Sequence, residues 1–420
     1  MVYVLPCYLF GNVRSTPDKR VLVPNPIDAS ALAEHYTRFR VSERLLLTGH
    51  SHQAWPDVSF EAQQRAWLDA ARHVDRKWDV AEGKAERYRE ALATLLDDQA
   101  GFVALGHNTH ELVTRVLSAL PLATRPRLVT TDGEFHSIRR QLDRLSEERV
   151  EVVKVAALPA STLAERLISE VDDRTAAVLV SCVLFLNAHI VPGLGSVLGA
   201  CEKVGAELLV DAYHSTNVAP ISLREEGLDG AFIVGGGYKY MQMGEGNGWL
   251  RFPRDCRLRP VLTGWFSEFA ALADKKSASG GSGGESGVLY SDGPARFAGA
   301  TYDPTSHYRA AAVSDFFAEQ NLTQDHLRAC SQHQIGLLVT EFDALDLDPA
   351  IVDRDRSVPL ESLGGFLALT SPQAPRITSA LAERGVQVDH RGDVLRLGPA
   401  PYLTDEQLRD AMSVLGDVAS

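Results

Sequence analysis

The chain has 420 residues, of which 45% are hydrophobic, and its formal net charge is −13, with acidic and basic side chains mixed along its length. A chain of this length and apolar content can bury a sizeable core and is expected to form about two domains. It has no basic tract of the kind that binds nucleic acid or an anionic membrane surface, so we expect a small-molecule partner.

The cysteine content and the N-terminal residues indicate in which cellular compartment the protein is expected. Five cysteines are an odd number, and their spacing shows no metal-like pairing, which fits reduced thiols in a cytoplasmic protein. Residues 1–13 are apolar, but they lack a basic start and a clear cleavage site, and they are too short to span a bilayer. We interpret them as part of an N-terminal extension, either disordered or packed on the body, with a signal peptide as the alternative.

The first predicted elements are a strand and a long helical region. The apolar run from Leu45 breaks at Gly49 into a polar loop that holds His50 and His52. Two histidines at this spacing can bind a metal, but no further ligand cluster stands near them, so we predict no metal site. Residues 59–97 read as a helical stretch broken at Gly83. Trp67, Ala71, Val74 and Trp78 recur at helical spacing, which favours core positions for the two tryptophans over a cofactor-binding role.

A second helix is predicted to begin at Asn108 or Thr109. A capping residue followed by a helix N-terminus leaves free N–H groups that suit a phosphate, although an ordinary helix cap is the alternative. Strands and helices then alternate, which indicates a mainly parallel sheet with helices on both faces. The predicted elements are a strand at 127–131, a strand at 150–155, a helix at 161–171 and a strand at 176–181.

The stretch 208–250 carries the chemistry. One short apolar run ends on Asp211, and a second enters three glycines before Tyr238 and Lys239. Both runs predict buried strands, and open α/β sheets bind ligands at the C-terminal ends of such strands. A carboxylate at one strand end and a lysine after the next suit pyridoxal phosphate (PLP). The lysine can form a Schiff base with the aldehyde, and the acid can keep the pyridine nitrogen protonated.

The C-terminal third predicts a smaller α+β unit. Ser277–Gly287 is rich in serine and glycine and is expected to be a mobile loop. A helical segment from about Ala311 leads into elements predicted at 366–370 (strand), 375–384 (helix), 386–389 and 394–397 (strands), and from 404 (helix). We therefore expect three parts: an N-terminal extension and segment that packs on the small domain (1–58), a large cofactor-binding domain (59–310) and a small C-terminal domain (311–420).

Several of these residues together resemble a known family. Asp211-Ala212-Tyr213-His214, Asn217, Pro220 and Gly237-Tyr238-Lys239-Tyr240, followed by Gly244 and Gly246, are similar to kynureninase, in the class-V aminotransferase branch of the fold-type-I PLP enzymes. The resemblance runs from about Leu45 onward. It implies an α/β fold-type-I architecture, with a mainly parallel seven-stranded-type sheet flanked by helices and a small α+β domain. It also implies a homodimer with its active sites at the subunit interface.

The resemblance implies roles for individual residues. Lys239 would hold the cofactor and move the Cα proton, Asp211 would face the ring nitrogen, and Tyr238 would bind phosphate and relay a proton. His214 would orient Asp211 or pack beside the ring, with a purely structural role as the alternative. Further cofactor contacts are implied at Asn108, Thr109, Phe135, Ser181, Trp265 and Thr301. Substrate contacts are implied at Arg396, for an α-carboxylate, and hypothesised at His50 and His52.

Three functions are compatible with these residues. The first is kynureninase-type hydrolysis of L-kynurenine or its 3-hydroxy form, giving anthranilate (or 3-hydroxyanthranilate) and L-alanine. The second is another class-V PLP reaction, such as transamination, β-elimination or a biosynthetic step, and departures from the family pattern motivate it. They occur at His50, Ile138, Asn187 and Ser267. The third is a non-catalytic binding or regulatory protein, which Asp211 and Lys239 argue against. Cysteine desulfuration is less attractive, because no cysteine stands in an obvious mobile loop.

Overall fold

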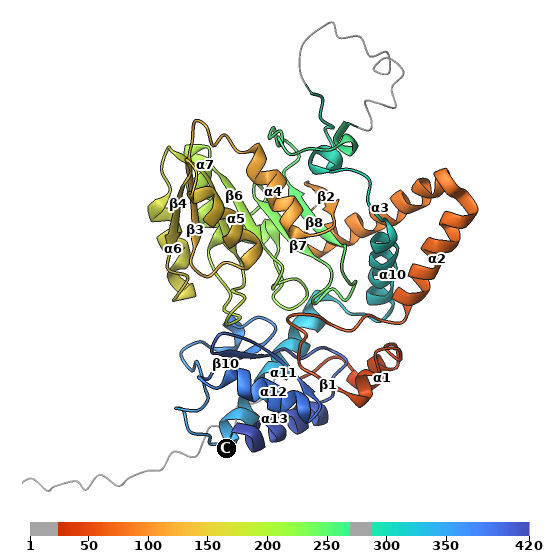
Figure 1. The fold of residues 1–420 in the computed structure, drawn as a ribbon, viewed down its shortest axis with the longest axis vertical. Coiled ribbons are helices and arrows are strands. Elements are labelled where there is room, and N and C mark those ends of the chain that lie inside the picture. Colours follow the sequence, from red (N-terminus) through yellow and green to blue (C-terminus); the bar gives the residue numbers. More distant parts are fainter. Residues whose placement is uncertain (1–23, 99, 269–287, 420) are drawn as a thin grey trace, which may run out of the picture.

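The structure is a computed structural model that describes residues 24–98, 100–268 and 288–419 (Figure 1). The expectations for the first 23 residues and for the whole of the serine- and glycine-rich segment Ser277–Gly287 lie outside these ranges. None of the described helices combines the length and the apolarity needed to traverse a bilayer.

A seven-stranded sheet forms the centre of the larger part, in the order β2-β8-β7-β6-β5-β3-β4. Its pairs are parallel, except that β8 runs antiparallel to both of its neighbours. This arrangement confirms the predicted α/β fold with a mainly parallel sheet. The strands are β2 (Phe102–Gly106), β3 (Arg127–Thr131), β4 (Glu151–Val155), β5 (Thr175–Ser181), β6 (Glu207–Asp211), β7 (Phe232–Gly236) and β8 (Gly248–Phe252).

Helices cover both faces of this sheet, because its central strands are apolar on both sides. Every residue of β5 and β7 is buried. One face packs on α3, α6, α7 and α10, and the other packs on α4 and α5. The helices are α3 (Lys77–Leu95), α4 (Thr109–Ala119), α5 (His136–Ser146), α6 (Leu163–Glu170), α7 (Leu194–Val204), α8 (Leu223–Glu226) and α10 (Thr305–Glu319).

The long helical region divides at a position that differs from the expectation. Helix α2 (Val58–His73) ends at Val74, which adopts a left-handed φ of 49°, whereas Gly83 lies inside α3. The predicted core position is wrong for Trp67, which is 73% exposed, whereas Trp78 is partly buried against the cluster that α2, α3 and α10 form. Helix α2 instead buries the small side chains of Ala62 and Ala66 against α3 and α10. Helical spacing placed the large residues on one face but could not show which face is covered.

The C-terminal part forms a second core, to which the N-terminal segment contributes. A four-stranded antiparallel sheet has the order β12-β13-β10-β9, and β1 pairs in parallel with β11, with Leu45 opposite Val386. Buried side chains of the segment before α2, including Tyr36 and Leu47, belong to this core. The strands are β1 (Leu45–Leu46), β9 (Asp353–Arg354), β10 (Leu367–Thr370), β11 (Val386–Gln387), β12 (Asp389–Arg391) and β13 (Val394–Leu397). The helices are α1 (Ala29–Ala33), α11 (Gln324–Ala344), α12 (Ala374–Glu383) and α13 (Asp405–Ala419).

Candidate active site

The C-terminal ends of β5, β6 and β7 meet at one edge of the large sheet. Ser181 pairs in register with Asp211, and Asp211 pairs with Val234 on β7, shortly before Lys239. The side chains at these ends surround a cavity of about 210 Å³, several times the roughly 30 Å³ of one water molecule. Its lining residues are Asn108, Thr109, His110, Phe135, Ser137, Ser181, Asp211, Tyr213, His214, Tyr238 and Lys239.

Lys239 is a buried amine, only 5% exposed. Its Nζ lies 2.6 Å from Nε2 of His214, and it faces the rings of Tyr213 and Phe135, with centroids at 4.8 and 5.3 Å. Burial lowers the pKa of Lys239 to about 7, although the charge of Asp211 acts in the opposite direction. An amine with this pKa is available in its neutral, nucleophilic form near neutral pH.

Asp211 is a buried carboxyl group on the same cavity. Burial raises its pKa, while a 2.8 Å hydrogen bond from the backbone N–H of Tyr213 and the charge of Lys239 oppose the shift. Among the described residues, no ion pair within 4 Å involves Asp211. Burial also lowers the pKa of His214 well below its usual range, so this ring is neutral. An uncompensated carboxylate on a cavity wall fits a ligand that places a cationic N–H beside it.

Two helix N-termini contribute to the cavity wall. Asn108 caps α4, and its side chain accepts a 3.0 Å hydrogen bond from the N–H of Glu111. The next residue, Thr109, lies with its Oγ1 3.5 Å from the carbonyl oxygen of Gly235. Phe135 occupies the equivalent position before α5, and Ser137 follows in its first turn. Both helix ends bring positive partial charge and free N–H groups to the cavity, which suits an anionic group such as phosphate.

A glycine allows the close approach of α4 to the sheet. A Cβ built on Gly248 would lie 2.8 Å from the backbone N, Cα and C atoms of Asn108. That distance is too short for any side chain, so β8 can pack against the start of α4 only where the strand begins with glycine.

Glu134 is a site residue that the sequence reasoning missed. Its Oε2 accepts a 2.6 Å hydrogen bond from Oγ of Ser181, and its Oε1 accepts bonds from Oγ1 of Thr131 (2.7 Å) and N–H of Ser181 (3.2 Å). Burial raises the pKa of Glu134 to about 7. The hydroxyl of Ser181 therefore donates its hydrogen bond to Glu134 and not to a ligand in the cavity. The position of Glu134, directly before Phe135 and shortly after the strand that ends at Thr131, was the available signal.

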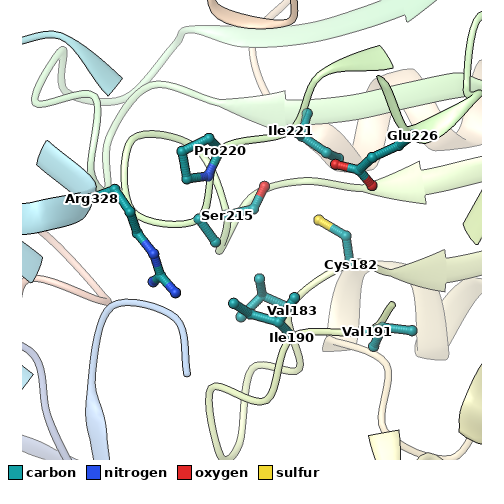
Figure 2. A pocket seen from close by; sticks show the side chains of 10 residues that line it. Cys182, Val183, Ile190, Val191, Ser215, Pro220, Ile221, Glu226 and Arg328 are labelled. Atoms are coloured by element: carbon teal, nitrogen blue, oxygen red, sulfur yellow. The ribbon is translucent and has the colours of Figure 1, made fainter. Parts of the chain in front are cut away.

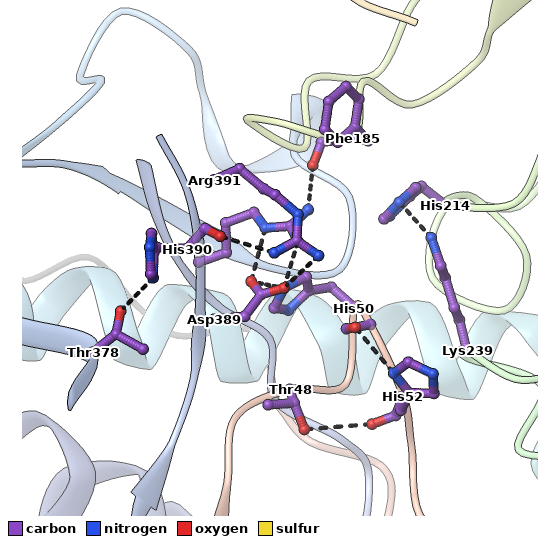
Figure 3. Close-up of polar contacts among 12 residues, drawn as sticks. Thr48, His50, His52, Phe185, His214, Lys239, Thr378, Asp389, His390 and Arg391 are labelled. Carbon is purple, nitrogen blue, oxygen red and sulfur yellow. Dashed lines mark hydrogen bonds and ion pairs between the residues drawn. The ribbon is translucent and has the colours of Figure 1, made fainter. Parts of the chain in front are cut away.

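Arg396 and His50 both bond to Asp389 and form a polar cluster with it. Figure 3 shows His50 and Asp389 on the side of the small sheet. Nε and Nη2 of Arg396 donate to the two carboxylate oxygens of Asp389 at 2.9 and 2.6 Å, and Nη1 donates to the carbonyl oxygen of Phe185 at 2.7 Å. The fully buried His50 lies with Nε2 2.8 Å from Oδ1 of the same aspartate. Neither Arg396 nor His50 lines the cavity.

The remaining predicted residues lie at the periphery. His52 stacks on Tyr238 with ring centroids 4.9 Å apart, and its side chain is 61% exposed. Trp265 is 44% exposed and donates from Nε1 to Oγ1 of Thr301 at 3.2 Å. The structure thus brings eight predicted residues to the cavity, while His50, His52, Trp265, Thr301 and Arg396 do not line it.

A second cavity, of about 150 Å³, lies behind the end of β5 (Figure 2). Its wall includes Cys182, Ser215, Glu226 and Arg328, among mainly apolar residues. Burial raises the pKa of the Cys182 thiol to about 12, so the thiol stays protonated. Arg328 donates to the carbonyl oxygens of Val218, Glu361 and Leu363 and has a structural role. Among its described lining residues, this cavity has no counterpart of the lysine amine and aspartate carboxylate, Lys239 and Asp211, that line the first cavity.

Comparison with known proteins identifies the class of fold. The chain superimposes on C-DES, in a variant with glycine covalently linked to its PLP cofactor, with a TM-score of 0.77 and 17% identity, covering 92% of this chain and 99% of that one. It superimposes on the cysteine desulfurase CsdA from Escherichia coli with a TM-score of 0.75 and 16% identity, covering 94% and 99%. The architecture is therefore that of the fold-type-I PLP enzymes.

Sequence comparison adds two findings. Residues 354–415 match the family described as the kynureninase C-terminal domain. The uncharacterized aminotransferase YcbU of Bacillus subtilis (strain 168) is 23% identical over 352 residues, which cover 82% of this chain and 87% of YcbU.

Proposed function

We propose that the chain is a PLP-dependent enzyme in which Lys239 holds the cofactor. The observation that carries this proposal is the convergence of Lys239, Asp211 and the N-terminus of α4 on one cavity of a fold-type-I architecture. The residues fit the group, because a buried amine with a pKa of about 7, a buried carboxylate and a helix N-terminus match its aldehyde, ring nitrogen and phosphate. The C-DES structure, which holds PLP, has the same fold.

The bound group would supply an electron sink for charge that develops at the substrate's Cα. Asp211 would stabilise a protonated ring nitrogen by its negative charge, and Phe135 would offer a flat apolar surface for the ring. Asn108 and Thr109, at the start of α4, would bind the phosphate. Lys239 would hold the aldehyde carbon and would remove and return the Cα proton of the substrate.

Within this class, kynureninase-type hydrolysis is the reaction that we favour. In it, water adds across the Cβ–Cγ bond of L-kynurenine or its 3-hydroxy form, the bond breaks, and the products are anthranilate (or 3-hydroxyanthranilate) and L-alanine. The support is the kynureninase match at residues 354–415, a range that includes Arg396. In this reaction Arg396 would receive the α-carboxylate, since a guanidinium matches a planar carboxylate.

A second candidate is another class-V reaction, such as transamination, β-elimination or a biosynthetic step. The support is the 23% identity to YcbU, together with the departures from the family pattern at His50, Ile138, Asn187 and Ser267. Desulfuration through a cysteine of this chain has less support. Burial raises the thiol pKa to about 12 for Cys182, Cys201 and Cys330 and to about 11 for Cys256, and none of the four lines the cavity.

We also propose that the protein is a homodimer in which Trp265 and Thr301 reach the partner's cavity. The support is that the two residues bond to one another on the surface and do not line the cavity of their own chain. Sedimentation tests this proposal. A monomer with full activity would contradict it.

The experiment that tests the function starts from purified protein incubated with PLP. Wild type is expected to gain a visible absorbance band, and Lys239→Ala is expected to lack it while retaining its helical circular dichroism. Lys154→Ala, which removes a half-exposed lysine, is the matched control and should keep the band. A colourless wild type would overturn the cofactor proposal.

Product analysis then distinguishes the reactions. Anthranilate fluorescence on addition of L-kynurenine supports hydrolysis. Amino transfer to an added keto acid, without release of alanine from kynurenine, supports the second candidate.

A further inference from the structure

Only some of the N–H groups of the Arg396 guanidinium have a hydrogen-bond acceptor within the described ranges. It has five N–H groups, of which Nε–H and one on Nη2 donate to Asp389, while one on Nη1 donates to the carbonyl oxygen of Phe185. One N–H on Nη1 and one on Nη2 have no partner among the described residues. Two donors on neighbouring nitrogens match the two oxygens of one carboxylate.

Asp389 is itself held from several directions. It faces Arg396 across the β12–β13 hairpin, where the two residues are register partners. Its Oδ1 also lies 2.8 Å from Nε2 of His50, which comes from the loop after β1. The ring of Phe366 packs beside both groups, at 4.8 Å from the His50 ring and 5.6 Å from the guanidinium carbon. Segments far apart in the chain therefore hold one arginine in one orientation.

His50 acts on Asp389 as a neutral donor. The ring is completely buried, and its Nδ1 has no partner in the described part of the chain. Burial lowers the pKa of His50 to about 4, so the ring is uncharged at neutral pH and offers the proton on Nε2 to the carboxylate. Arg391 also belongs to the cluster, with Nη2 3.4 Å from Oδ2 of Asp389. The cluster then carries two positive charges, on Arg396 and Arg391, and one negative charge on Asp389.

The cluster adjoins the Lys239 cavity. Phe185, whose carbonyl oxygen accepts from Nη1, packs edge-on against Phe135 of the cavity wall, with ring centroids 5.4 Å apart. The charge of Arg396 also contributes to the lowered pKa values of Lys239 and His214. Figure 3 shows Lys239 and His214 facing the cluster from the side of the large sheet.

We propose that Asp389 and His50 are positioning residues, which orient Arg396 so that its two free N–H groups receive a carboxylate of the substrate. The inference rests on the proposed function of the Lys239 cavity. Asp389 offsets only one of the two positive charges of Arg396 and Arg391, so its proposed role is to orient the hydrogen bonds that Arg396 offers to the substrate carboxylate.

Two opposite outcomes of Asp389→Asn separate positioning from charge. If Asp389 positions Arg396, the variant loses a bidentate partner and binds carboxylates more weakly. If charge alone matters, the variant frees a positive charge and binds them more tightly. The probe is L-alanine compared with L-alaninamide, which have the same amine but differ in the carboxylate. Calorimetric titration of the PLP-loaded protein gives a dissociation constant for each compound. The constant for L-alaninamide divided by that for L-alanine is the preference ratio, and it reports binding of the carboxylate.

The ratio is expected to favour L-alanine in wild type and to fall about tenfold in Asp389→Asn, the size expected from losing one charge-assisted hydrogen bond. His50→Ala should lower the ratio, and His50→Gln, which retains a donor of similar reach, should restore part of it. Asp343→Asn is the matched control, because Asp343 makes the same bidentate contact with Arg354, at 2.8 and 2.6 Å, away from the cavity. It should keep the wild-type ratio.

The failures are distinguishable. An unchanged or increased ratio in Asp389→Asn overturns the positioning role and leaves the proposed function standing. A wild-type ratio near one overturns the carboxylate site itself. A wild type without a visible band overturns the cofactor proposal, and calorimetry of the same protein still decides whether Asp389 sets the preference for a carboxylate. Thermal melting of each variant identifies any that fail to fold.

Discussion

The Nζ of Lys239 lies 2.6 Å from Nε2 of His214, and both side chains are buried. A lysine amine can donate in either protonation state, so Nε2 accepts and the neutral imidazole carries its proton on Nδ1. Nδ1 has no partner among the described residues. His214 therefore directs one N–H of the amine without adding a charge to the cavity, which keeps the neutral form of Lys239 accessible.

The lowered pKa of Lys239 predicts a pH-dependent stability of the cofactor-free protein. The pKa is about 7 when folded and near 10.5 when unfolded, so between these values the unfolded chain binds more protons. The free energy of unfolding should then rise with pH across this window, and the stabilisation should be lost as pH falls through 7. From pH 7 to pH 9, wild type should gain about 2 kcal/mol relative to Lys239→Met. Urea unfolding at both pH values measures this, with Lys154→Met as control. Equal slopes in wild type and Lys239→Met would contradict it.

Glu134 predicts a slope of the opposite sign at lower pH. Its pKa is raised from 4.5 to about 7 in the folded state, so between these values the folded chain binds more protons. Stability from this group is fully present below pH 4.5 and is lost as pH rises through 7. Glu134→Gln should remove a change of about 2 kcal/mol between pH 5 and pH 7. Unfolding in urea at the two pH values tests it, with the exposed Glu147→Gln as comparison. A slope that survives in Glu134→Gln would show that other groups cause it.

The ion pair between Arg251 and Asp98 should matter for folding. The two side chains are 1% and 3% exposed, and Nε of Arg251 lies 2.7 Å from Oδ2 of Asp98. Asp98→Asn leaves a buried guanidinium without its counter-charge and should lower the free energy of unfolding by about 3 kcal/mol. The comparison is Glu148→Gln, which breaks an exposed pair with Arg144 and should leave stability unchanged. Equal midpoints of denaturation for the two variants would refute the expectation.

Two glycine substitutions should have opposite consequences. Gly248→Ala places a Cβ 2.8 Å from the backbone of Asn108 and should push the start of α4 away from the sheet. PLP affinity, measured by absorbance titration, should fall about tenfold if one phosphate hydrogen bond is lost. Gly83→Ala meets no atom within 4 Å inside α3 and should raise stability by about 1 kcal/mol without altering PLP affinity. An unchanged affinity in Gly248→Ala would show that α4 tolerates the displacement.

The parallel part of the large sheet could be predicted because its strands are short apolar runs that end at polar or turn residues. β6 ends on Asp211, and β7 leads into glycines. β8 was not predicted, since it begins with Gly248 and carries Arg251, whose charge is compensated by an aspartate distant in the sequence. The exposure of Trp67 was missed for a related reason. Periodicity defines a face of a helix, but the neighbouring helices decide whether it is covered.

In the site, too, features set by local sequence could be predicted, whereas contacts between distant segments could not. Local sequence placed Asn108, Asp211 and Lys239 at element ends, and the topology of the sheet brought those ends together. The contact between His50 and Asp389 joins residues 339 positions apart, and no pattern within either segment indicates it. Glu134 was missed because a glutamate after a strand reads as exposed unless the hydroxyl donors on neighbouring strands are known.

The pairing of β1 with β11 has a consequence for biosynthesis. Leu45 is made early and Val386 near the end, so the N-terminal strand has no partner until almost the whole polypeptide has left the ribosome. Up to that point its apolar side chains stay unprotected, and chaperones are expected to engage this region of the nascent chain.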